Sequence, residues 1–418
     1  MQLFKPSPMS DEEVSLNDDD IAEEVEIESE DEDVENGDGD GEDGSSNQST
    51  DGSEAEEEFV PEREDAKIIF QEHTGSVFCC DIDKTGKMVV TGGEDDLAYV
   101  WNITNGNVEF TCTGHKDSVT SASFNKDGTL VATGDMSGEI RIWKVSSKDL
   151  LWSDSIHELT WMEWHPASNI IFVGSAEGHV TFWRVPSGDC KVLPSPGFST
   201  QSGKVLPDGT RAVIGYEDGS VRIFDLRSCK CLHTVAGQGS SHGISTIGCH
   251  RDNNLILAGT LSGDARLITT KNGKLVSDLL CTDPYPSCVE SAVFCPVETH
   301  SDLAACVTTN GDVSIWEISK QEVRDGIMIG EGVTKLGWSP TETWLVIGCL
   351  NGEILLFNAL DTRNEHKLLG HRANILDFCL TGDGSKLVSV SDDHTARVFE
   401  MPNIELSSTE GTEAGEAH

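Results

Sequence analysis

The chain has 418 residues, of which 73 are acidic and 29 basic, and its formal net charge is −44. This excess of negative charge argues against direct binding to the phosphates of DNA or RNA. The chain has no apolar stretch of about 18 residues and no signal-like start, so we expect no membrane insertion and a cytoplasmic protein, with passage through the nucleus left open.

The negative charge is concentrated at the two ends of the chain. Residues 1–65 contain 27 acidic residues and two basic ones, and residues 401–418 add four glutamates, which leaves a net charge of −15 for residues 66–400. Segments this charged and this poor in apolar side chains cannot offset the entropy lost on ordering. We therefore predict a disordered acidic tail at each end and a compact body between them.

Two roles are open for the N-terminal tail. A disordered polyanion can imitate nucleic acid toward a basic protein and keep that protein in solution, or it can simply make its own chain more soluble. Ser10, Ser29 and Ser53 each precede acidic residues. They are therefore candidate phosphorylation sites for acidophilic kinases.

Residues 66–400 repeat a common pattern of short β-type runs. Each run ends in an aromatic or large apolar residue, and successive ends lie 40 to 48 residues apart, at Trp101, Trp143, Trp183, Phe224, Ile268, Trp316, Phe357 and Phe399. This spacing is typical of four-stranded propeller blades. We therefore predict eight blades, or seven if the weak fifth repeat is irregular.

The second repeat shows the internal order most clearly. An alternating strand passes through Val119 and Phe124, a turn follows at residues 125–128, a second strand reaches Gly134, and a third strand ends at Trp143. Alternating apolar residues bounded by Gly, Asp and Asn turns indicate β-hairpins. Regular short strands without helical stretches predict an all-β fold that closes on itself.

This pattern resembles the WD-repeat family, in which Gly-His precedes the first strand and a Trp-Asp-like pair follows the third. The resemblance spans nearly all of residues 66–400 and implies a WD40-type β-propeller, closed by pairing residues 66–71 with the strand that ends at Phe399. It also implies a buried Asp-His-Ser/Thr-Trp network, for which the candidates are His73, Thr91, Asp95, Trp101, His115, Trp143, His371 and Asp393. The fifth repeat departs from the pattern, with Ile268 at the tryptophan position and Ser262 at the aspartate position.

Neither the cysteines nor the histidines indicate a cofactor or a metal site. The 13 cysteines are scattered without paired CxxC spacing, so we expect reduced thiols that serve as small apolar groups. His73, His115 and His371 fall at structural repeat positions. The chain has no GxSxG elbow, HExxH helix, Walker loop or dinucleotide fingerprint, so we expect no enzymatic activity.

In WD propellers, three positions per repeat form the rim of the narrow, top face: two at the start of the first strand and one just before the network aspartate. Transferred repeat by repeat, the resemblance assigns to this rim Ser76, Phe78, Glu94, Ser118, Thr120, Met136, Glu158, Thr160, Ala176, Ser199, Gln201, Glu217, Gly243, Ser245, Leu261, Cys288, Glu290, Thr309, Gly332, Thr334, Leu350, Asn374, Leu376 and Asp392. Five of these 24 residues are acidic and none is Lys or Arg, although the basic content of the body would place about two among them.

The rim is therefore predicted to carry an acidic ring of Glu94, Glu158, Glu217, Glu290 and Asp392. The ring is widened by Asp95, Asp96 and Asp218, and apolar patches are expected at Phe78, Met136 and Leu376. Clustered carboxylates accelerate the encounter with cations, and apolar contacts prolong the complex. The surface suits a basic, partly extended peptide. The alternative is that these acids are ordinary solvated turn residues.

Several longer strings are more specific than the repeat pattern. They include Thr91-Gly-Gly-Glu-Asp-Asp96, Gly114-His-Lys-Asp-Ser-Val-Thr120, Val131-Ala-Thr-Gly-Asp-Met-Ser-Gly138, Trp161-Met-Glu-Trp-His-Pro166 and Gly215-Tyr-Glu-Asp-Gly219. Together with the acidic N-terminal segment, they resemble the angio-associated migratory cell protein family. The resemblance implies a non-enzymatic WD protein. A fungal relative is a chaperone for the basic N-terminal segment of a new large-subunit ribosomal protein, and animal members are associated with cell migration and angiogenesis.

These observations lead to two hypotheses of different class. The first is an assembly chaperone that holds a basic large-subunit ribosomal protein on the acidic top face and releases it at the nascent subunit. The second is a signalling scaffold whose rim binds several folded proteins of a migration pathway through apolar hot spots. A closed propeller has no structural need for a partner subunit, so we expect a monomer.

Overall fold

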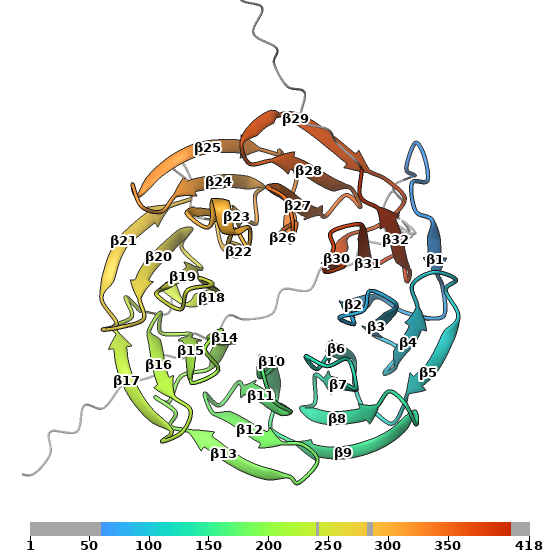
Figure 1. Cartoon of the computed structure of the whole chain (residues 1–418), viewed down its shortest axis with the longest axis horizontal. Helices are drawn as coiled ribbons and strands as arrows, with labels where there is room; N and C mark the ends of the chain where they lie inside the picture. The colour runs from blue at the N-terminus through green and yellow to red at the C-terminus, as the bar shows by residue number, and fades with distance from the viewer. Residues whose placement is uncertain (1–59, 240–241, 282–286, 403–418) are drawn as a thin grey trace, which may run out of the picture. The chain divides into compact units, whose positions relative to one another are not determined.

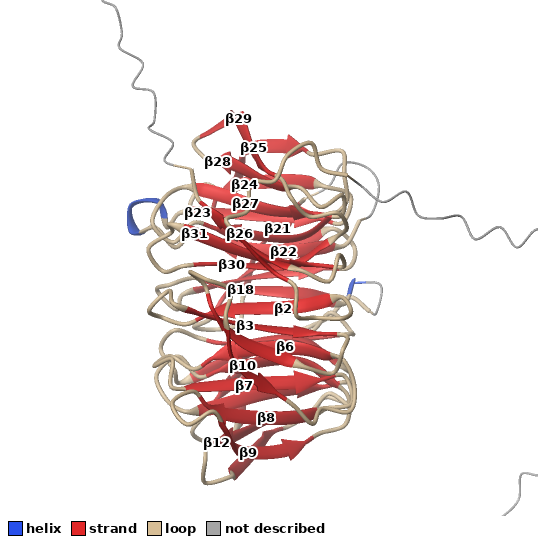
Figure 2. Ribbon diagram, turned by 90° about the vertical axis from the view of Figure 1, so that its right-hand side faces the viewer, coloured by secondary structure: helices blue, strands red, loops and turns tan. Residues whose placement is uncertain are grey.

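A computed structural model of the chain describes residues 60–239, 242–281 and 287–402, all within the compact unit Glu57–His418. Eight four-stranded antiparallel sheets stand side by side around a central axis (Figure 1). Seen from the side, the strands run between two ends formed by loops (Figure 2). The predicted all-β propeller with eight blades is confirmed, and the fifth repeat forms a complete blade.

In seven of the eight blades the strands follow the chain order from the axis outward, and the outermost strand of the eighth blade comes from the start of the chain. The first four blades consist of β2 (Val77–Ile82), β3 (Met88–Gly93), β4 (Ala98–Asn102) and β5 (Val108–Cys112); β6 (Val119–Phe124), β7 (Leu130–Asp135), β8 (Glu139–Lys144) and β9 (Asp149–Ser155); β10 (Leu159–Trp164), β11 (Ile170–Ser175), β12 (Val180–Arg184) and β13 (Asp189–Leu193); and β14 (Thr200–Val205), β15 (Arg211–Tyr216), β16 (Val221–Asp225) and β17 (Lys230–Val235).

The other four blades repeat this order. They consist of β18 (Ile244–Cys249), β19 (Leu255–Thr260), β20 (Asp264–Thr269) and β21 (Leu275–Leu280); β22 (Val289–Phe294), β23 (Leu303–Thr308), β24 (Asp312–Glu317) and β25 (Glu322–Met328); β26 (Val333–Trp338), β27 (Trp344–Cys349), β28 (Ile354–Asn358) and β29 (Asp361–Leu368); and β30 (Ile375–Leu380), β31 (Lys386–Ser391), β32 (Ala396–Glu400) and β1 (Ile68–Phe70).

The antiparallel order fixes which loops share an end of the disc. In each blade the innermost strand begins at one end, and the loop between the second and third strands returns to that end. We call this end the top face. The bottom face is the opposite end, which carries the loops between the first and second strands and between the third and fourth.

The ring closes because the first strand pairs with the last. Ile68 of β1 lies opposite Val398 of β32, which matches the closure implied by the WD resemblance. Ordered contacts begin slightly before the expected boundary at residue 66, since the Asp65 amide donates to the Leu369 carbonyl and Asp65 Oδ2 accepts from the Leu369 amide, both at 2.9 Å. The body therefore includes the residues that precede β1.

The C-terminal boundary is also displaced slightly. The Met401 amide, expected to lie in the tail, donates to the Ser385 carbonyl at 2.9 Å. The remainder of the two predicted acidic tails, residues 1–59 and 403–418, lies outside the described residues.

Apolar side chains form eight clusters, one at each interface between neighbouring blades. Between the first two blades, for example, Val100 and Phe110 pack with Val119 and Trp143. Burying one such side chain contributes about 1.5–3 kcal/mol. The core is therefore a ring of interfaces, and this ring fixes the loops at both faces relative to one another.

Helical structure is minimal, as expected. The short 3₁₀ helix η2 (Glu298–His300) lies in the loop between β22 and β23. Over the ranges that the structure covers, no helix has the length and apolar character needed to cross a membrane.

Candidate partner-binding site on the top face

All eight blades hold their rim residues in the same way. In each blade the backbone amide of the third rim residue donates a hydrogen bond of 2.8–3.1 Å to the carbonyl oxygen of the first. The pairs are Glu94 to Ser76, Met136 to Ser118, Ala176 to Glu158, Glu217 to Ser199, Leu261 to Gly243, Thr309 to Cys288, Leu350 to Gly332 and Asp392 to Asn374. These residues therefore occupy equivalent places on one face.

The second rim residue of every blade occupies a β-bulge near the start of the innermost strand. The register passes from Val77 to Cys79 and skips Phe78. The same skip occurs at Thr120, Thr160, Gln201, Ser245, Glu290, Thr334 and Leu376. Because a bulge leaves one residue unpaired and re-aims its side chain, each blade presents one such side chain beside the central axis.

The five predicted acids share the top face but differ in exposure. Glu94, Glu158 and Glu217 are exposed, whereas Glu290 and Asp392 are half-buried. Within the described part of the chain, the carboxylates of Glu158 and Glu217 have no hydrogen-bond or ion-pair partner. These two groups are available to a cationic ligand.

The other three acids have local partners. Glu94 Oε2 accepts a hydrogen bond from the Ser76 amide at 3.1 Å, and Asp392 Oδ2 accepts one from the Asn374 side chain at 2.8 Å. Burial raises the pKa of Glu290. A cation beside Glu290 would replace part of the hydration that this carboxylate has lost.

The three acids expected to widen the ring differ in their surroundings. The Asp95 side chain is only 6% exposed, and its two oxygens lie 3.0 and 3.1 Å from His73 Nδ1. Asp95 is therefore a network residue, and direct contact with a partner does not fit its burial. Asp96, with φ of 59°, and Asp218, whose Oδ1 accepts the Ser220 amide at 2.9 Å, both lie in half-buried turns.

The exposed apolar residues of the rim are only partly those that were predicted. Met136 is 53% exposed, whereas Phe78 and Leu376 are half-buried. Leu261 and Leu350 are 46% and 44% exposed, although the sequence did not single them out as patches. Their rim positions were predictable, but their exposure depends on how the neighbouring blades pack.

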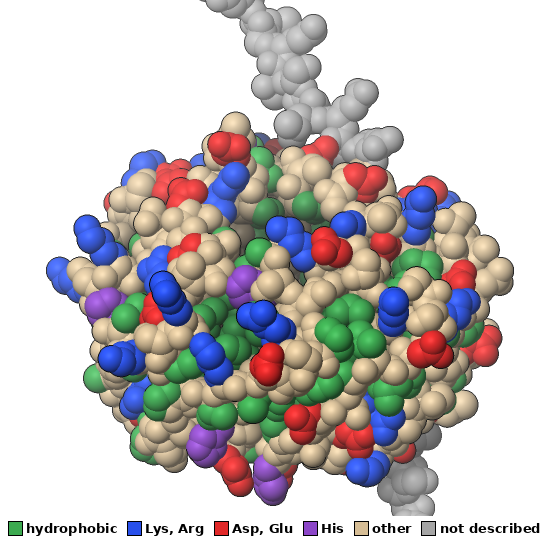
Figure 3. Space-filling model, turned by 60° about the horizontal axis from the view of Figure 1, so that its bottom comes forward, with side chains coloured by type: hydrophobic (Ala, Val, Ile, Leu, Met, Phe, Trp, Pro, Cys, Tyr) green, Lys and Arg blue, Asp and Glu red, His purple; other side chains and the backbone are tan. Residues whose placement is uncertain are grey.

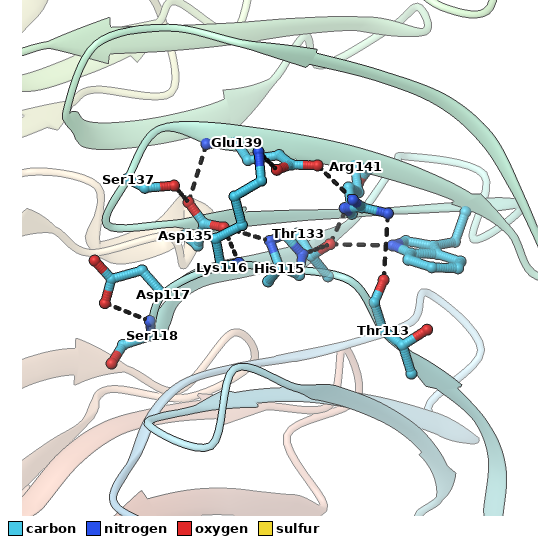
Figure 4. A network of polar contacts seen from close by, with 11 residues as sticks. Thr113, His115, Lys116, Asp117, Ser118, Thr133, Asp135, Ser137, Glu139 and Arg141 are labelled. Carbon is cyan, nitrogen blue, oxygen red and sulfur yellow. Dashed lines mark hydrogen bonds and ion pairs between the residues drawn. The ribbon is translucent and has the colours of Figure 1, made fainter.

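A buried polar network fixes the top-face loops of the second blade (Figure 4). His115 Nδ1 lies 3.0 Å from Asp135 Oδ2, and His115 Nε2 lies 2.7 Å from Thr133 Oγ1. The same Thr133 oxygen accepts the indole N–H of Trp143 at 3.0 Å. With a neutral imidazole, Trp143 donates to Thr133, Thr133 donates to Nε2, and Nδ1–H donates to Asp135. Each of these buried groups is then paired, as burial requires.

The electrostatics of this network favour a neutral histidine beside a charged aspartate. Burial lowers the pKa of His115 against the opposing attraction of Asp135. Burial also opposes ionisation of Asp135, but hydrogen bonds from Ser137 and from the amides of Glu139 and Lys116 outweigh it and lower the pKa of that carboxyl. In this network the charge therefore lies on Asp135, which is itself buried but hydrogen-bonded, and the imidazole of His115 stays neutral.

The first and eighth blades contain related networks. His73 Nε2 lies 3.0 Å from Thr91 Oγ1, which accepts the indole N–H of Trp101 at 3.3 Å. His371 lies 2.9 Å from Asp393 and 2.8 Å from Ser389, and Phe399 replaces the tryptophan. All eight residues expected in the networks are thus found at blade positions of this kind.

Sequence reasoning missed three network members, Thr133, Asp135 and Ser389. The hydroxyl residues were within reach, because the histidine precedes its hydroxyl partner by 18 residues in all three networks. Asp135 was harder to find. It aligns with Gly93 rather than with Asp95, so it reaches the histidine from the end of the strand and not from the turn.

Basic residues lie near the axis but below the rim, where acids of neighbouring blades neutralise them. Lys335, directly after the bulge residue Thr334, forms an ion pair with Asp377 of the next blade. Lys204 lies 3.1 Å from Glu163 of the preceding blade. The rim therefore keeps its negative charge.

The remaining expectations concern modification and metals. Ser10, Ser29 and Ser53, the candidate phosphorylation sites, lie outside the described residues. All 13 cysteines are described, and each is a free thiol. Among the side chains that the structure describes, no three or more His, Cys, Asp or Glu come together in a group that could hold a metal ion.

Comparison with known proteins identifies the repeats and the family. The WD domain, G-beta repeat family matches residues 65–102, 106–144 and 363–400. The angio-associated migratory cell protein of Homo sapiens is 39% identical over 350 residues, which covers 80% of each chain. The ribosome assembly protein SQT1 of Saccharomyces cerevisiae is 25% identical over 386 residues and covers 80% of this chain and 86% of that protein.

A solved structure supports the fold. The structure of Chaetomium thermophilum Sqt1 bound to the N-terminus of ribosomal protein L10 superposes with a TM-score of 0.73 at 20% identity and covers 81% of this chain and all of that one. None of these three proteins is described as an enzyme. By its identity to the human protein over four-fifths of both chains, this chain belongs to the angio-associated migratory cell protein family of WD-repeat proteins.

Proposed function

We propose that this protein is a non-enzymatic, monomeric chaperone of the cytoplasm that holds a basic segment of a large-subunit ribosomal protein on its acidic top face. The observation that carries the proposal is the rim, where equivalent positions hold five acids and no Lys or Arg. The relative SQT1 is described as a ribosome assembly protein, and a structural neighbour is bound to the N-terminus of ribosomal protein L10.

The two kinds of rim residue would act at different stages of binding. The exposed carboxylates of Glu94, Glu158 and Glu217 attract a cationic segment before contact, and this long-range attraction accelerates association. Met136 and Leu350 offer apolar surface on the same rim, and contacts with them would slow dissociation. A new ribosomal protein would thereby be shielded from other polyanions until it is delivered.

The test is binding of a fluorescein-labelled peptide from the N-terminus of ribosomal protein L10 to the full-length protein, followed by fluorescence anisotropy and stopped flow. The double charge reversal Glu94→Lys with Glu217→Lys should weaken affinity about tenfold, mainly through slower association. The loss should shrink as salt rises, because salt screens exposed charges.

The matched control is Glu342→Lys, which makes the same change at an exposed glutamate in a bottom-face loop. We expect this variant to bind the peptide like the parent protein. If the double reversal binds as tightly as the parent, or if Glu342→Lys is equally impaired, the acidic ring is not the binding site.

A second candidate function is a signalling scaffold. It is favoured by the exposed apolar rim residues Met136, Leu261 and Leu350, which can act as hot spots for folded partners. Pull-down from cytosol at low and moderate salt separates the two functions. One dominant basic client that is lost with salt supports the chaperone, whereas several salt-insensitive partners that are lost on Leu350→Ser support the scaffold.

A further inference from the structure

A cavity of about 390 Å³ lies on the bottom face between the third and fourth blades. Its walls include, in the third blade, the loop that joins β10 to β11, the end of β12 and the start of β13, and, in the fourth blade, the loops that join β14 to β15 and β16 to β17. The acidic ring is at the other end of the same strands. The cavity is therefore separate from the site proposed above.

The interior of the cavity is aromatic and aliphatic. The rings of Phe172 and Phe182 stack with their centroids 4.7 Å apart, and Ile170 and Leu226 complete the apolar lining. These side chains also belong to, or pack against, the core between the two blades. The floor is therefore held by the same packing that stabilises the propeller.

His165 forms part of the wall, but its ring nitrogens are already engaged. Nε2 donates to the carbonyl of Gly209 in the fourth blade at 2.8 Å, and Nδ1 accepts the Ala167 amide at 3.1 Å. The imidazole thus ties the two blades together across the cavity. Because its nitrogens are used in this way, it offers little to a hydrophilic ligand deep in the cavity.

Three basic side chains, Arg184, Lys191 and Arg227, surround this apolar interior, and all three are exposed. Over the described ranges none of them has a carboxylate within ion-pair distance. The acid of the lining, Asp189, accepts a hydrogen bond from Ser187 at 2.8 Å. Lys191 Nζ donates to the Arg227 carbonyl at 3.1 Å, and the charge of Arg227 also acts on Asp225. Because the three cations still form no ion pair among the described residues, they make the mouth of the cavity attractive to anions.

The surroundings of the third blade show the same combination of charge and apolar surface. Figure 3 brings forward the side of the molecule that carries β9, β12 and β13, where Lys and Arg side chains lie beside hydrophobic ones, with Asp and Glu side chains among them. A partner that enters the cavity would therefore meet both kinds of surface.

We propose that this cavity docks an acidic segment of another protein, through one aromatic or aliphatic side chain that is flanked by Asp or Glu. The apolar interior has the size to bury one such anchor, and a buried anchor in a pocket is a common source of binding energy. The cations at the mouth would pair with the flanking carboxylates. A free phosphate or a sugar fits less well, since the interior is apolar and the cations lie outside it.

This second site extends the proposed function, because a basic client and an acidic partner would occupy opposite faces of one disc. The inference rests only on the cavity and does not require the top face to bind a ribosomal protein. Its failure would leave the chaperone proposal intact, and the reverse is also true.

Two exposed thiols provide internal reporters for the test. Cys190 lines the cavity, whereas Cys231 lies on β17 outside it, and both are exposed. The probe is a fluorescein-labelled peptide with one phenylalanine flanked on both sides by glutamates. We expect it to raise the fluorescence anisotropy on binding the full-length protein, and to slow alkylation of Cys190 by N-ethylmaleimide several-fold without affecting Cys231.

Charge-reversal variants test the cations. Arg184→Glu with Arg227→Glu should weaken binding of the acidic peptide about tenfold. Lys126→Glu is the matched control, since it reverses an exposed lysine in a bottom-face turn of the second blade, and it should bind normally. The top-face variant Glu94→Lys with Glu217→Lys should also bind normally, which distinguishes this site from the acidic ring.

Changes in the peptide test the same proposal on unaltered protein, so the result does not depend on the folding of a variant. Replacing the phenylalanine by serine, or the glutamates by glutamines, should each reduce affinity about tenfold or more. Equal alkylation of Cys190 with and without peptide, or unchanged affinity for the serine or glutamine peptide, would overturn the proposal.

Discussion

Thr133 in the second blade serves two buried partners at once, since its hydroxyl oxygen accepts the indole N–H of Trp143 and its proton faces His115. Asp135 completes the chain of hydrogen bonds from the end of β7. The 18-residue spacing of histidine and threonine makes the contact between His115 and Thr133 predictable from sequence. The contact between His115 and Asp135 was not predictable, because it depends on the direction in which the Asp135 side chain leaves the strand.

Asp81 is a residue whose ionisation should oppose folding. Its Oδ2 accepts the amide of Phe124 in the second blade at 2.8 Å, and its Oδ1 accepts the Ile82 amide at 2.9 Å. Burial nevertheless raises the pKa of Asp81 to about 6. The folded state therefore binds this proton more tightly than the unfolded chain, and the contribution of Asp81 to stability falls as pH rises from about 4 to about 6.

We therefore expect Asp81→Asn to increase the free energy of unfolding at pH 7 by about 1–2 kcal/mol, which allows for partial hydration of this half-buried group. The two proteins should be equally stable near pH 4, where Asp81 is protonated. Urea denaturation at both pH values measures the difference. A variant that is less stable than the parent at pH 7 would contradict this account.

Asp83 provides the control, because its shift has the opposite sign. Burial opposes its ionisation, but hydrogen bonds from Thr85 and from the amides of Met88 and Lys87 outweigh burial and lower the pKa of Asp83. This group contributes stability above about pH 4 that is lost as pH falls. Asp83→Asn should therefore destabilise the protein at neutral pH.

At the scale of single elements, β1 closes the propeller although it has only three residues. Phe70 is 2% exposed and stacks on Trp101 of the first blade with ring centroids 4.6 Å apart. Ile69, its neighbour in the strand, is exposed. The strand thus joins the eighth blade by hydrogen bonds and the first blade by one aromatic side chain.

Phe70 and Ile69 therefore serve as test and control positions for substitution within β1. Phe70→Ala should lower the free energy of unfolding by about 3–5 kcal/mol, because it removes a large ring from a packed interface. Ile69→Ala should cost less than about 1 kcal/mol. Denaturant titration of both variants checks the difference, and equal losses would mean that closure does not depend on the aromatic contact.

The fifth blade shows why the number of blades was predictable from spacing. Ile268 replaces the usual tryptophan, yet it is fully buried with Ile223 and Ile256 in the cluster between the fourth and fifth blades. A large apolar side chain of either kind fills this interface, so the period of the repeat carries more information than the identity of one residue. The cavity beside Phe182 could not be predicted in this way, because it arises from loops of two blades that meet only in the folded chain.

On the scale of the whole molecule, the proposed binding of a cationic segment depends on the combined charge of the rim acids, and Glu290 makes that charge dependent on pH. Burial raises the pKa of Glu290, so this group becomes neutral at a higher pH than an ordinary glutamate. Binding of the L10 peptide should therefore weaken when the pH is lowered from 7 toward 5 at constant ionic strength.

Glu290→Gln separates this residue from the rest of the ring. The variant should bind more weakly than the parent at pH 7 and show a flatter dependence of Kd on pH, whereas Glu342→Gln on the bottom face should behave like the parent. Parallel pH profiles for the parent and Glu290→Gln would show that Glu290 does not contact the peptide.

The eighth blade combines β1 with β30, β31 and β32, and this imposes an order on biosynthesis. A nascent polypeptide leaves the ribosome from its N-terminus, so β1 emerges long before its partner has been translated. Until then the unfinished ring keeps unsatisfied strand edges of the kind that recruit other chains into aggregates. A protein proposed to protect newly made chains therefore passes through a vulnerable stage of its own, which ends only when its last repeat has been synthesised.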